Sequence, residues 1–196
     1  MSEIMPNITD PNRVILTGEN SFIRLHDEET GLQLTRTSHW RVLMSGAGSG
    51  HVLYMTGDVT DNEVKIYSDN IALARWLQAE IESFLYPDFA DTDIPVIDAI
   101  FENSGDIGSS WTEIVQSDEE TIYLSWYDFK TPYMLTVQAG TNEDRPHGVY
   151  SCFFPAKKAQ LTVNGSVVRG VPITEHRGTT ESSSACLAWS ETWVKP

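Results

Sequence analysis

The sequence predicts a mainly β protein, an antiparallel barrel or a strongly curved sheet, with one main α-helix at about residues 69–85. Many short runs alternate apolar and polar residues and are separated by turn signals, which is typical of strands. One run instead has apolar residues at helical spacing. Hydrophobic residues make up 40% of the 196 residues and include six Trp, seven Tyr and seven Phe, enough for a core. The chain is therefore predicted to form one domain, residues 1–196.

Three hairpins are predicted from turn signals. The first surrounds the polar loop at residues 27–30, and the second surrounds the glycine-rich segment at residues 46–51, for which a mobile loop is the alternative. The segment after this glycine loop reads as a strand rather than a helix, which argues against a dinucleotide or phosphate site. The third hairpin spans residues 159–169, where Asn164 and Gly165 suit a type I′ turn.

Two runs combine aromatic residues with a period-two alternation. In residues 121–129, Ile122, Leu124 and Trp126 alternate with Tyr123 and Tyr127, so the two sets are predicted on opposite faces. The tyrosines are expected to line a cavity with Trp111, Glu113 and Tyr133 of neighbouring strands. The last run, residues 185–194, alternates in the same way, and one face is predicted to carry Leu187, Trp189, Glu191 and Trp193.

The main helix has recognisable ends. Residues 68–70, Ser-Asp-Asn, supply N-cap side chains, and Pro87 ends the helical pattern. A second, short helix is predicted at residues 95–101, because Pro95 suits the first turn of a helix.

The stretch AQLTVNGSVVRG at residues 159–170, followed by the strand that contains Trp189, resembles the end of lipocalin-like barrels. It is most similar to the barrel halves of the AttH and carotenoid-hydratase group. The resemblance covers about a fifth of the chain. It implies a lipocalin-like barrel and assigns no functional residue.

The charge is strongly acidic and unevenly placed. Lys and Arg number 13 against 28 Asp and Glu, a formal net charge of -15. No basic residue lies between Arg75 and Lys130, a span that holds thirteen acidic residues. The charge argues against nucleic acid and anionic lipid as partners, and no apolar run is long enough to span a membrane. A solvated acidic face is predicted, while a patch for a basic partner and a cation at Asp88, Asp91 and Asp93 stay open.

Cellular location and cofactors are inferred from missing patterns. The first ten residues lack the basic and apolar regions of an export signal, which predicts a cytoplasmic protein. Two cysteines, Cys152 and Cys186, do not make a disulfide framework. No zinc-ligand spacing, nucleotide loop or nucleophile motif is present, so no metal, no cofactor and no covalent intermediate are expected. A homo-oligomer is left open.

The expected function is a cofactor-independent enzyme that transfers a proton on an apolar or aromatic small molecule, as lyases, hydratase-dehydratases and isomerases do. Histidines and desolvated carboxyl groups exchange protons near neutral pH, and a cationic arginine stabilises negative charge. The predicted catalytic residues are His39, His51, Asp58 and Glu113. The predicted substrate-binding residues are Arg24, Arg41, Trp111, Tyr123, Trp126 and Tyr133. A carrier of a hydrophobic ligand and an acidic protein-interaction domain are the alternatives.

Overall fold

The structure, a computed structural model, describes residues 13–196. The first ten residues, from which the lack of an export signal is predicted, lie outside the described residues. The main sheet is built from β1 (Val14–His26), β2 (Gln33–Ser45), β3 (Gly50–Gly57), β4 (Lys65–Ser68), β5 (Val96–Asp98), β6 (Ile100–Asp106), β7 (Ser110–Gln116), β8 (Thr121–Phe129), β9 (Tyr133–Val137), β10 (Gly148–Val163), β11 (Ser166–Val167) and β14 (Ala185–Val194). A separate hairpin is formed by β12 (Thr174–Arg177) and β13 (Thr180–Ser183).

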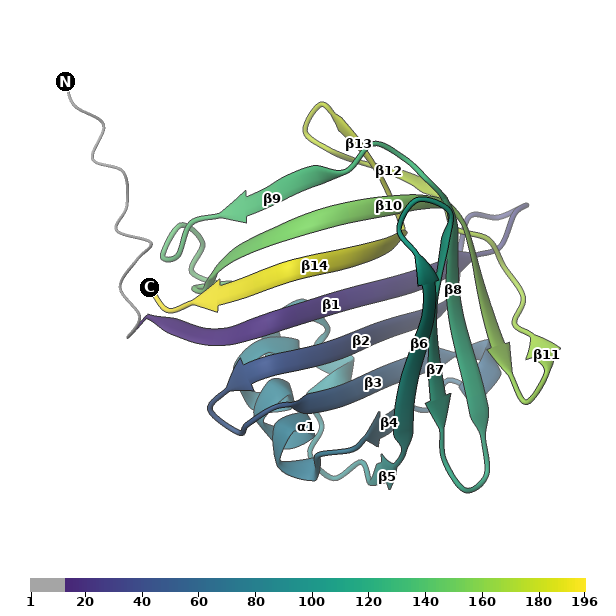
Figure 1. Cartoon of the computed structure of the whole chain (residues 1–196), viewed down its shortest axis with the longest axis horizontal. Helices are drawn as coiled ribbons and strands as arrows, with labels where there is room; N and C mark the ends of the chain where they lie inside the picture. Colours follow the sequence, from purple (N-terminus) through teal and green to yellow (C-terminus); the bar gives the residue numbers. More distant parts are fainter. Residues whose placement is uncertain (1–12) are drawn as a thin grey trace.

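The main sheet curves into a nearly closed barrel, which confirms the predicted fold class. Its strand order is β5-β4-β3-β2-β1-β14-β10-β8-β7-β6. The long strand β10 serves both halves, because its first half pairs with β14 and β9 and its second half pairs with β8. Strands β6 to β8 consequently turn over and cross in front of β1 to β3 (Figure 1). A single residue separates β5 from β6, so the two ends of the sheet lie close to closure.

The predicted helix is present and covers the outer face of β1 to β4 (Figure 1). It begins with α1 (Ile71–Leu77), continues as a π-helical turn η2 (Gln78–Glu82) and ends with α2 (Ser83–Leu85). The N-cap prediction is confirmed, because the Asn70 side chain accepts a hydrogen bond from the Leu73 backbone N–H at 3.1 Å. A short 3-10 turn, η3 (Pro87–Phe89), follows, and another, η1 (Asp58–Thr60), follows β3. No helix in residues 13–196 combines the length and apolar character needed to cross a membrane.

The predicted short helix at residues 95–101 is wrong. These residues form β5 and the start of β6, and β5 pairs in parallel with β4. The connection from β4 through the helix to β5 is thus a crossover unit, which requires an extended segment here. Val96, Ile97 and Ile100 are β-branched, and β-branched side chains favour that extended conformation.

Two main apolar cores lie on opposite faces of the curved sheet. The inner core fills the concave side and includes Leu53, Leu124, Trp126 and Leu187, all buried. The outer core lies between the sheet and the helix and includes Trp40, Leu77 and Ile81. A small third cluster forms around Phe22, Phe153 and Cys186 on the outer face. The helix therefore leaves the part of the outer face beside the third cluster uncovered.

The predicted hairpins are confirmed, and so are the two faces of the aromatic strand. The chain turns between β1 and β2, between β2 and β3, and at Asn164-Gly165, whose φ angles of 49° and 78° match a type I′ turn. On β8, Trp126 is buried in the inner core, whereas Tyr123 is 37% exposed.

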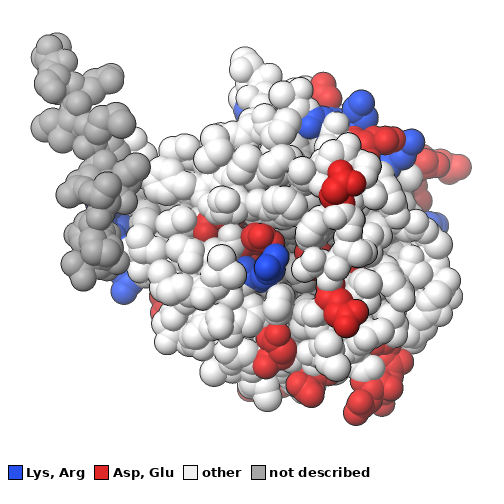
Figure 2. Space-filling view, viewed as in Figure 1, with Lys and Arg blue, Asp and Glu red and all other residues white. Residues whose placement is uncertain are grey.

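The thirteen acidic residues between Arg75 and Lys130 do not form a single solvated face. Figure 2 shows acidic side chains in separate groups, over β6 and the turns near the ends of β7 and, beside Lys and Arg, at the upper right, without a continuous block. Asp88 accepts a hydrogen bond from Arg36 at 2.7 Å, and Asp128 lies 2.8 Å from the Lys158 ammonium. Glu82 and Glu113 are fully or almost fully buried. Some acidic side chains of this span therefore lie inside the protein, where burial changes their pKa.

Candidate functional site

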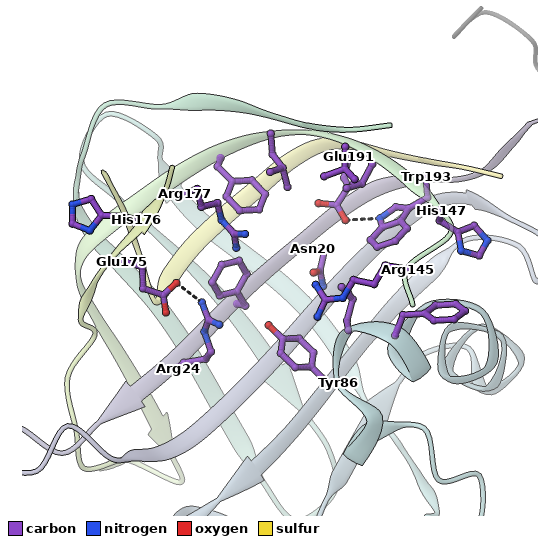
Figure 3. A pocket seen from close by; sticks show the side chains of 17 residues that line it. Asn20, Arg24, Tyr86, Arg145, His147, Glu175, His176, Arg177, Glu191 and Trp193 are labelled. Carbon is purple, nitrogen blue, oxygen red and sulfur yellow. Dashed lines mark hydrogen bonds and ion pairs between the residues drawn. The ribbon is translucent and has the colours of Figure 1, made fainter. Parts of the chain in front are cut away.

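A cavity of about 370 Å³, here called the outer pocket, opens on the outer face of the sheet. Strands β1, β10 and β14 form its floor, and the end of the helix, β9, β12 and the loop between β9 and β10 form its walls (Figure 3). Its volume suits a small molecule. Much of its lining is apolar: Phe22, Phe84, Leu85, Leu135, Val137, Val149 and Phe153.

Three arginines reach the outer pocket from three different elements. Arg24 of β1 lies 2.8 Å from the Glu175 carboxylate of β12, and its guanidinium stands over the Phe22 ring at 4.9 Å. Arg177 of β12 lies over the Phe153 ring at 5.5 Å. Arg145, from the loop between β9 and β10, extends from the opposite side toward the middle of the pocket (Figure 3). In residues 13–196, neither Arg145 nor Arg177 takes part in an ion pair with a carboxylate.

Glu191 faces the same pocket because β14 carries a bulge. Ser190 has a φ of 53°, and the pairing of β14 with both neighbours shifts register around this point. Leu187 and Trp189 therefore lie with the inner core, while Glu191 and Trp193 face outward. The predicted single face for these four residues is wrong, because a bulge reverses the alternation after it.

Glu191 is only 3% exposed, and one of its carboxyl oxygens accepts a hydrogen bond from Trp193 Nε1 at 2.6 Å. Burial raises the pKa of Glu191 to about 7, because the charged form loses its hydration. The hydrogen bond from Trp193 opposes this rise, and the nearby Glu82 adds to it. Glu191 therefore exchanges its proton near neutral pH.

Glu82 lies behind the pocket wall and is connected to it by hydrogen bonds. The π-helical turn ends at Glu82, whose Oε1 accepts hydrogen bonds from Trp40 Nε1 at 2.6 Å and Ser38 Oγ at 2.8 Å. Asn20, which lines the pocket, donates to Ser38 Oγ at 3.0 Å. Burial raises the pKa of Glu82 to about 7, and its Oε2 is buried without a hydrogen-bond partner among residues 13–196. π-Helical turns are frequent at functional sites.

A second group of polar residues, here called the inner cluster, lies on the concave face: Glu19, His39, Arg41, His51, Trp111 and Glu113. The ring of Phe101 on β6 packs against both histidines, with centroids 5.9 Å from His39 and 5.1 Å from His51. His39 and His51 are thus brought together by the β2–β3 hairpin, in which His39 pairs with Leu53 and His51 pairs with Arg41. His51 Nδ1 lies 2.7 Å from the Asp69 carboxylate.

His39 and Glu113 meet across the barrel, where His39 Nε2 lies 4.0 Å from Glu113 Oε2. Burial lowers the pKa of His39 to about 3 and raises that of Glu113 to about 7. Both shifts favour the neutral forms, so the pair is a contact between two desolvated groups rather than a strong ion pair. Trp111 Nε1 donates to Glu113 at 2.7 Å, and Arg41 lies 3.8 Å from Glu19. The inner cluster thus joins three of the four predicted catalytic residues.

The remaining predicted residues are dispersed. Asp58 is outside the inner cluster and faces Arg169 at 3.7 Å. Tyr133 packs on Phe153 beside the outer pocket, and its hydroxyl lies 2.9 Å from Ser182 Oγ.

The predicted cavity between the tyrosines and Glu113 is wrong. Glu113 pairs with Leu124, so its side chain shares the inner face with Trp126 rather than the exposed face of Tyr123. The fully buried Trp126 donates from its indole N–H to the Phe22 carbonyl at 3.1 Å.

The two cysteines, and the loop with Asp88, Asp91 and Asp93, lie within the described residues. Cys152 and Cys186 are free thiols, and burial raises the pKa of Cys186 to about 11. In residues 13–196 no group of three or more His, Cys, Asp or Glu side chains is arranged to hold a metal ion.

Four residues of the outer pocket and its wall were not predicted from the sequence: Glu82, Arg145, Arg177 and Glu191. They come from a π-helical turn, a loop, the strand β12 and a bulged strand, and no local motif connects them. The sequence around Glu191 held a weak signal of a site residue. A glutamate between two tryptophans of a strand has apolar neighbours, which desolvate its carboxyl group.

Comparisons with protein-family models, with curated proteins and with solved structures give no match to this chain. The resemblance to the AttH and carotenoid-hydratase barrels therefore stays a prediction.

Proposed function

We propose that this protein binds a small organic anion with an apolar or aromatic body in the outer pocket. The observation that carries the proposal is the convergence of Arg24, Arg145 and Arg177 on one cavity with an apolar wall, in a chain with a net charge of -15. Arginines hold carboxylate and phosphate groups through charge-assisted hydrogen bonds. The apolar wall would take up the remainder of the ligand, as small-molecule sites do.

The test compares an acid with its uncharged amide. By calorimetry, 3-phenylpropionate is expected to bind at least about tenfold more tightly than 3-phenylpropionamide. Replacing Arg145 or Arg177 by Met should weaken binding of the acid about 10- to 100-fold, because a hydrogen bond to a charged group contributes about 1.5–3 kcal/mol. Arg169, 70% exposed and outside the pocket, is the matched control, and its replacement by Met should leave binding unchanged. Equal affinities for acid and amide would contradict the proposal.

A second candidate function is the proton-transfer reaction expected from the sequence, on an apolar substrate at the inner cluster. The observation that favours it is the approach of Glu113 to His39 from across the barrel. Between these two, Glu113 is the better proton carrier, because its pKa of about 7 is near neutrality.

This candidate is tested with phenylacetone, a neutral aromatic ketone. Deuterium exchange from solvent into phenylacetone should be catalysed by the wild type and fall about 10²-fold or more in Glu113→Gln and His39→Ala. The Arg145→Met variant should keep the wild-type rate, because the substrate has no anionic group. Unchanged exchange in both inner-cluster variants would remove these residues from the mechanism.

A further inference from the structure

Glu191 is placed where a reacting group would be needed. It shares the outer pocket with the three arginines, and Trp193 Nε1 holds its Oε1 at 2.6 Å. No lysine or arginine in residues 13–196 forms an ion pair with Glu191. A buried carboxyl group without a cationic partner is costly, and such groups occur preferentially at functional sites.

The surroundings of Glu191 explain why its proton is available. The other titratable and charged groups that line the pocket come from β1, the helix, β12 and the loop before β10: Arg24, Tyr86, Arg145, His147, Glu175, His176 and Arg177. Figure 3 shows His147 beside Trp193 and His176 turned away from the centre of the pocket. Glu82 acts from behind the wall and raises the pKa of Glu191 further.

We infer that Glu191 is the general base and acid of a proton-transfer reaction, and that the substrate is a 2-oxo acid with an apolar or aromatic side chain. The inference rests on the proposed function, because the arginines must first hold the carboxylate of the substrate. A carboxylate base removes a proton from carbon only when that carbon is activated, and the 2-oxo group activates the adjacent C3–H bond. The apolar wall receives the side chain.

The reaction is an enolisation that needs no co-reactant. The C3–H bond of the 2-oxo acid breaks, and its proton moves to Glu191 Oε2, since Oε1 is already held by Trp193. The electron pair of that bond forms the C2–C3 double bond, and the carbonyl oxygen becomes an enolate oxygen. A pocket arginine stabilises this oxygen, because arginine stays protonated. Glu191 then returns the proton to the enolate oxygen, which gives the enol, or to C3.

Phenylpyruvate is the probe for this inference. Deuterium exchange at its C3 position, followed by proton NMR, should be faster with the wild type than without protein. Glu191→Gln should lower the catalysed rate by about 10²- to 10⁴-fold, the usual contribution of a general acid–base group. Glu181, 61% exposed and paired with Lys130 outside the pocket, is the matched control, and Glu181→Gln should keep the wild-type rate.

The pH profile separates catalysis from a structural role. The exchange rate of the wild type should rise with pH through the pKa of Glu191, near 7, because the base form accepts the proton. Trp193 is a positioning residue whose hydrogen bond lowers that pKa. Trp193→Phe should therefore move the inflection to higher pH.

Binding of 3-phenylpropionate, which has the same skeleton without the 2-oxo group, shows which proposal fails. Binding without catalysed exchange into phenylpyruvate, or exchange at the wild-type rate in Glu191→Gln, would overturn the role of Glu191 and leave the proposed function standing. Absence of binding by both acids would overturn both.

Discussion

Replacing Trp126 by alanine is expected to lower the free energy of unfolding by about 3–5 kcal/mol, the usual cost of removing a buried tryptophan. Trp126 is fully buried in the inner core, on β8. Its indole N–H donates to the backbone carbonyl of Phe22 on β1, 104 residues away in sequence. The side chain thus connects β8, which belongs to the strands that cross in front of the sheet, to β1 behind it. Because the total stability of a domain is about 5–15 kcal/mol, this loss is a large fraction of it.

Chemical denaturation of two further variants isolates the cause. Tyr123 lies on the same strand with its side chain on the exposed face, so Tyr123→Ala should cost less than about 1 kcal/mol. Trp126→Phe keeps an aromatic ring but removes the hydrogen bond, and should cost an intermediate amount. Equal stability of Trp126→Ala and the wild type would mean that the barrel closes without this contact. Trp126 was predicted to bind substrate, and its complete burial favours a structural role instead.

The fold could be predicted from the sequence because its signals are local. Alternation on β8, the N-cap at Asn70 and the turn at Asn164-Gly165 each depend on residues that are neighbours in the chain. The inner cluster was predicted in part for the same reason, since one hairpin carries both His39 and His51. Glu113 joins them through barrel closure, which no short segment encodes.

The buried carboxyl groups in and behind the outer pocket could not be predicted, because two backbone irregularities position them. The bulge at Ser190 turns Glu191 outward, although a positive φ at serine has no recognisable sequence pattern. The π-helical turn ends at Glu82, in a stretch that reads from its sequence as an ordinary α-helix. Arg24 and Arg177 meet only in the folded chain, across about 150 residues of sequence. Tertiary packing decides each of these positions.

Glu82 should make the protein less stable as pH rises, in the opposite direction to most buried carboxylates that form ion pairs. The pKa of Glu82 is about 7 in the folded protein against an ordinary value of 4.5. Between these values the unfolded chain releases its proton while the folded protein retains it, so unfolding becomes more favourable as pH rises. At about 1.4 kcal/mol for each pH unit of that window, ionisation of Glu82 is expected to cost about 3 kcal/mol in total.

The substitution Glu82→Gln measures this cost, because glutamine keeps the acceptor oxygen for Trp40 and Ser38 and does not titrate. Its stability relative to the wild type should increase by about 3 kcal/mol between pH 4.5 and pH values above 7. Subtracting the wild-type curve removes the parallel contributions of Glu113 and Glu191 and the opposite one of His39. A difference that stays constant with pH would mean that Glu82 is ionised in the folded protein at acid pH.

Glu191→Gln should behave in the same way, since burial is the main cause of the raised pKa at both positions. The two effects are expected to be less than additive. Removing the charge of Glu82 lowers the pKa of Glu191 toward its ordinary value, so less stability remains to be gained there. A double-mutant cycle at pH 8 measures this coupling directly. Strict additivity would mean that the two carboxyl groups titrate independently, and that Glu82 does not help to keep Glu191 protonated near neutral pH.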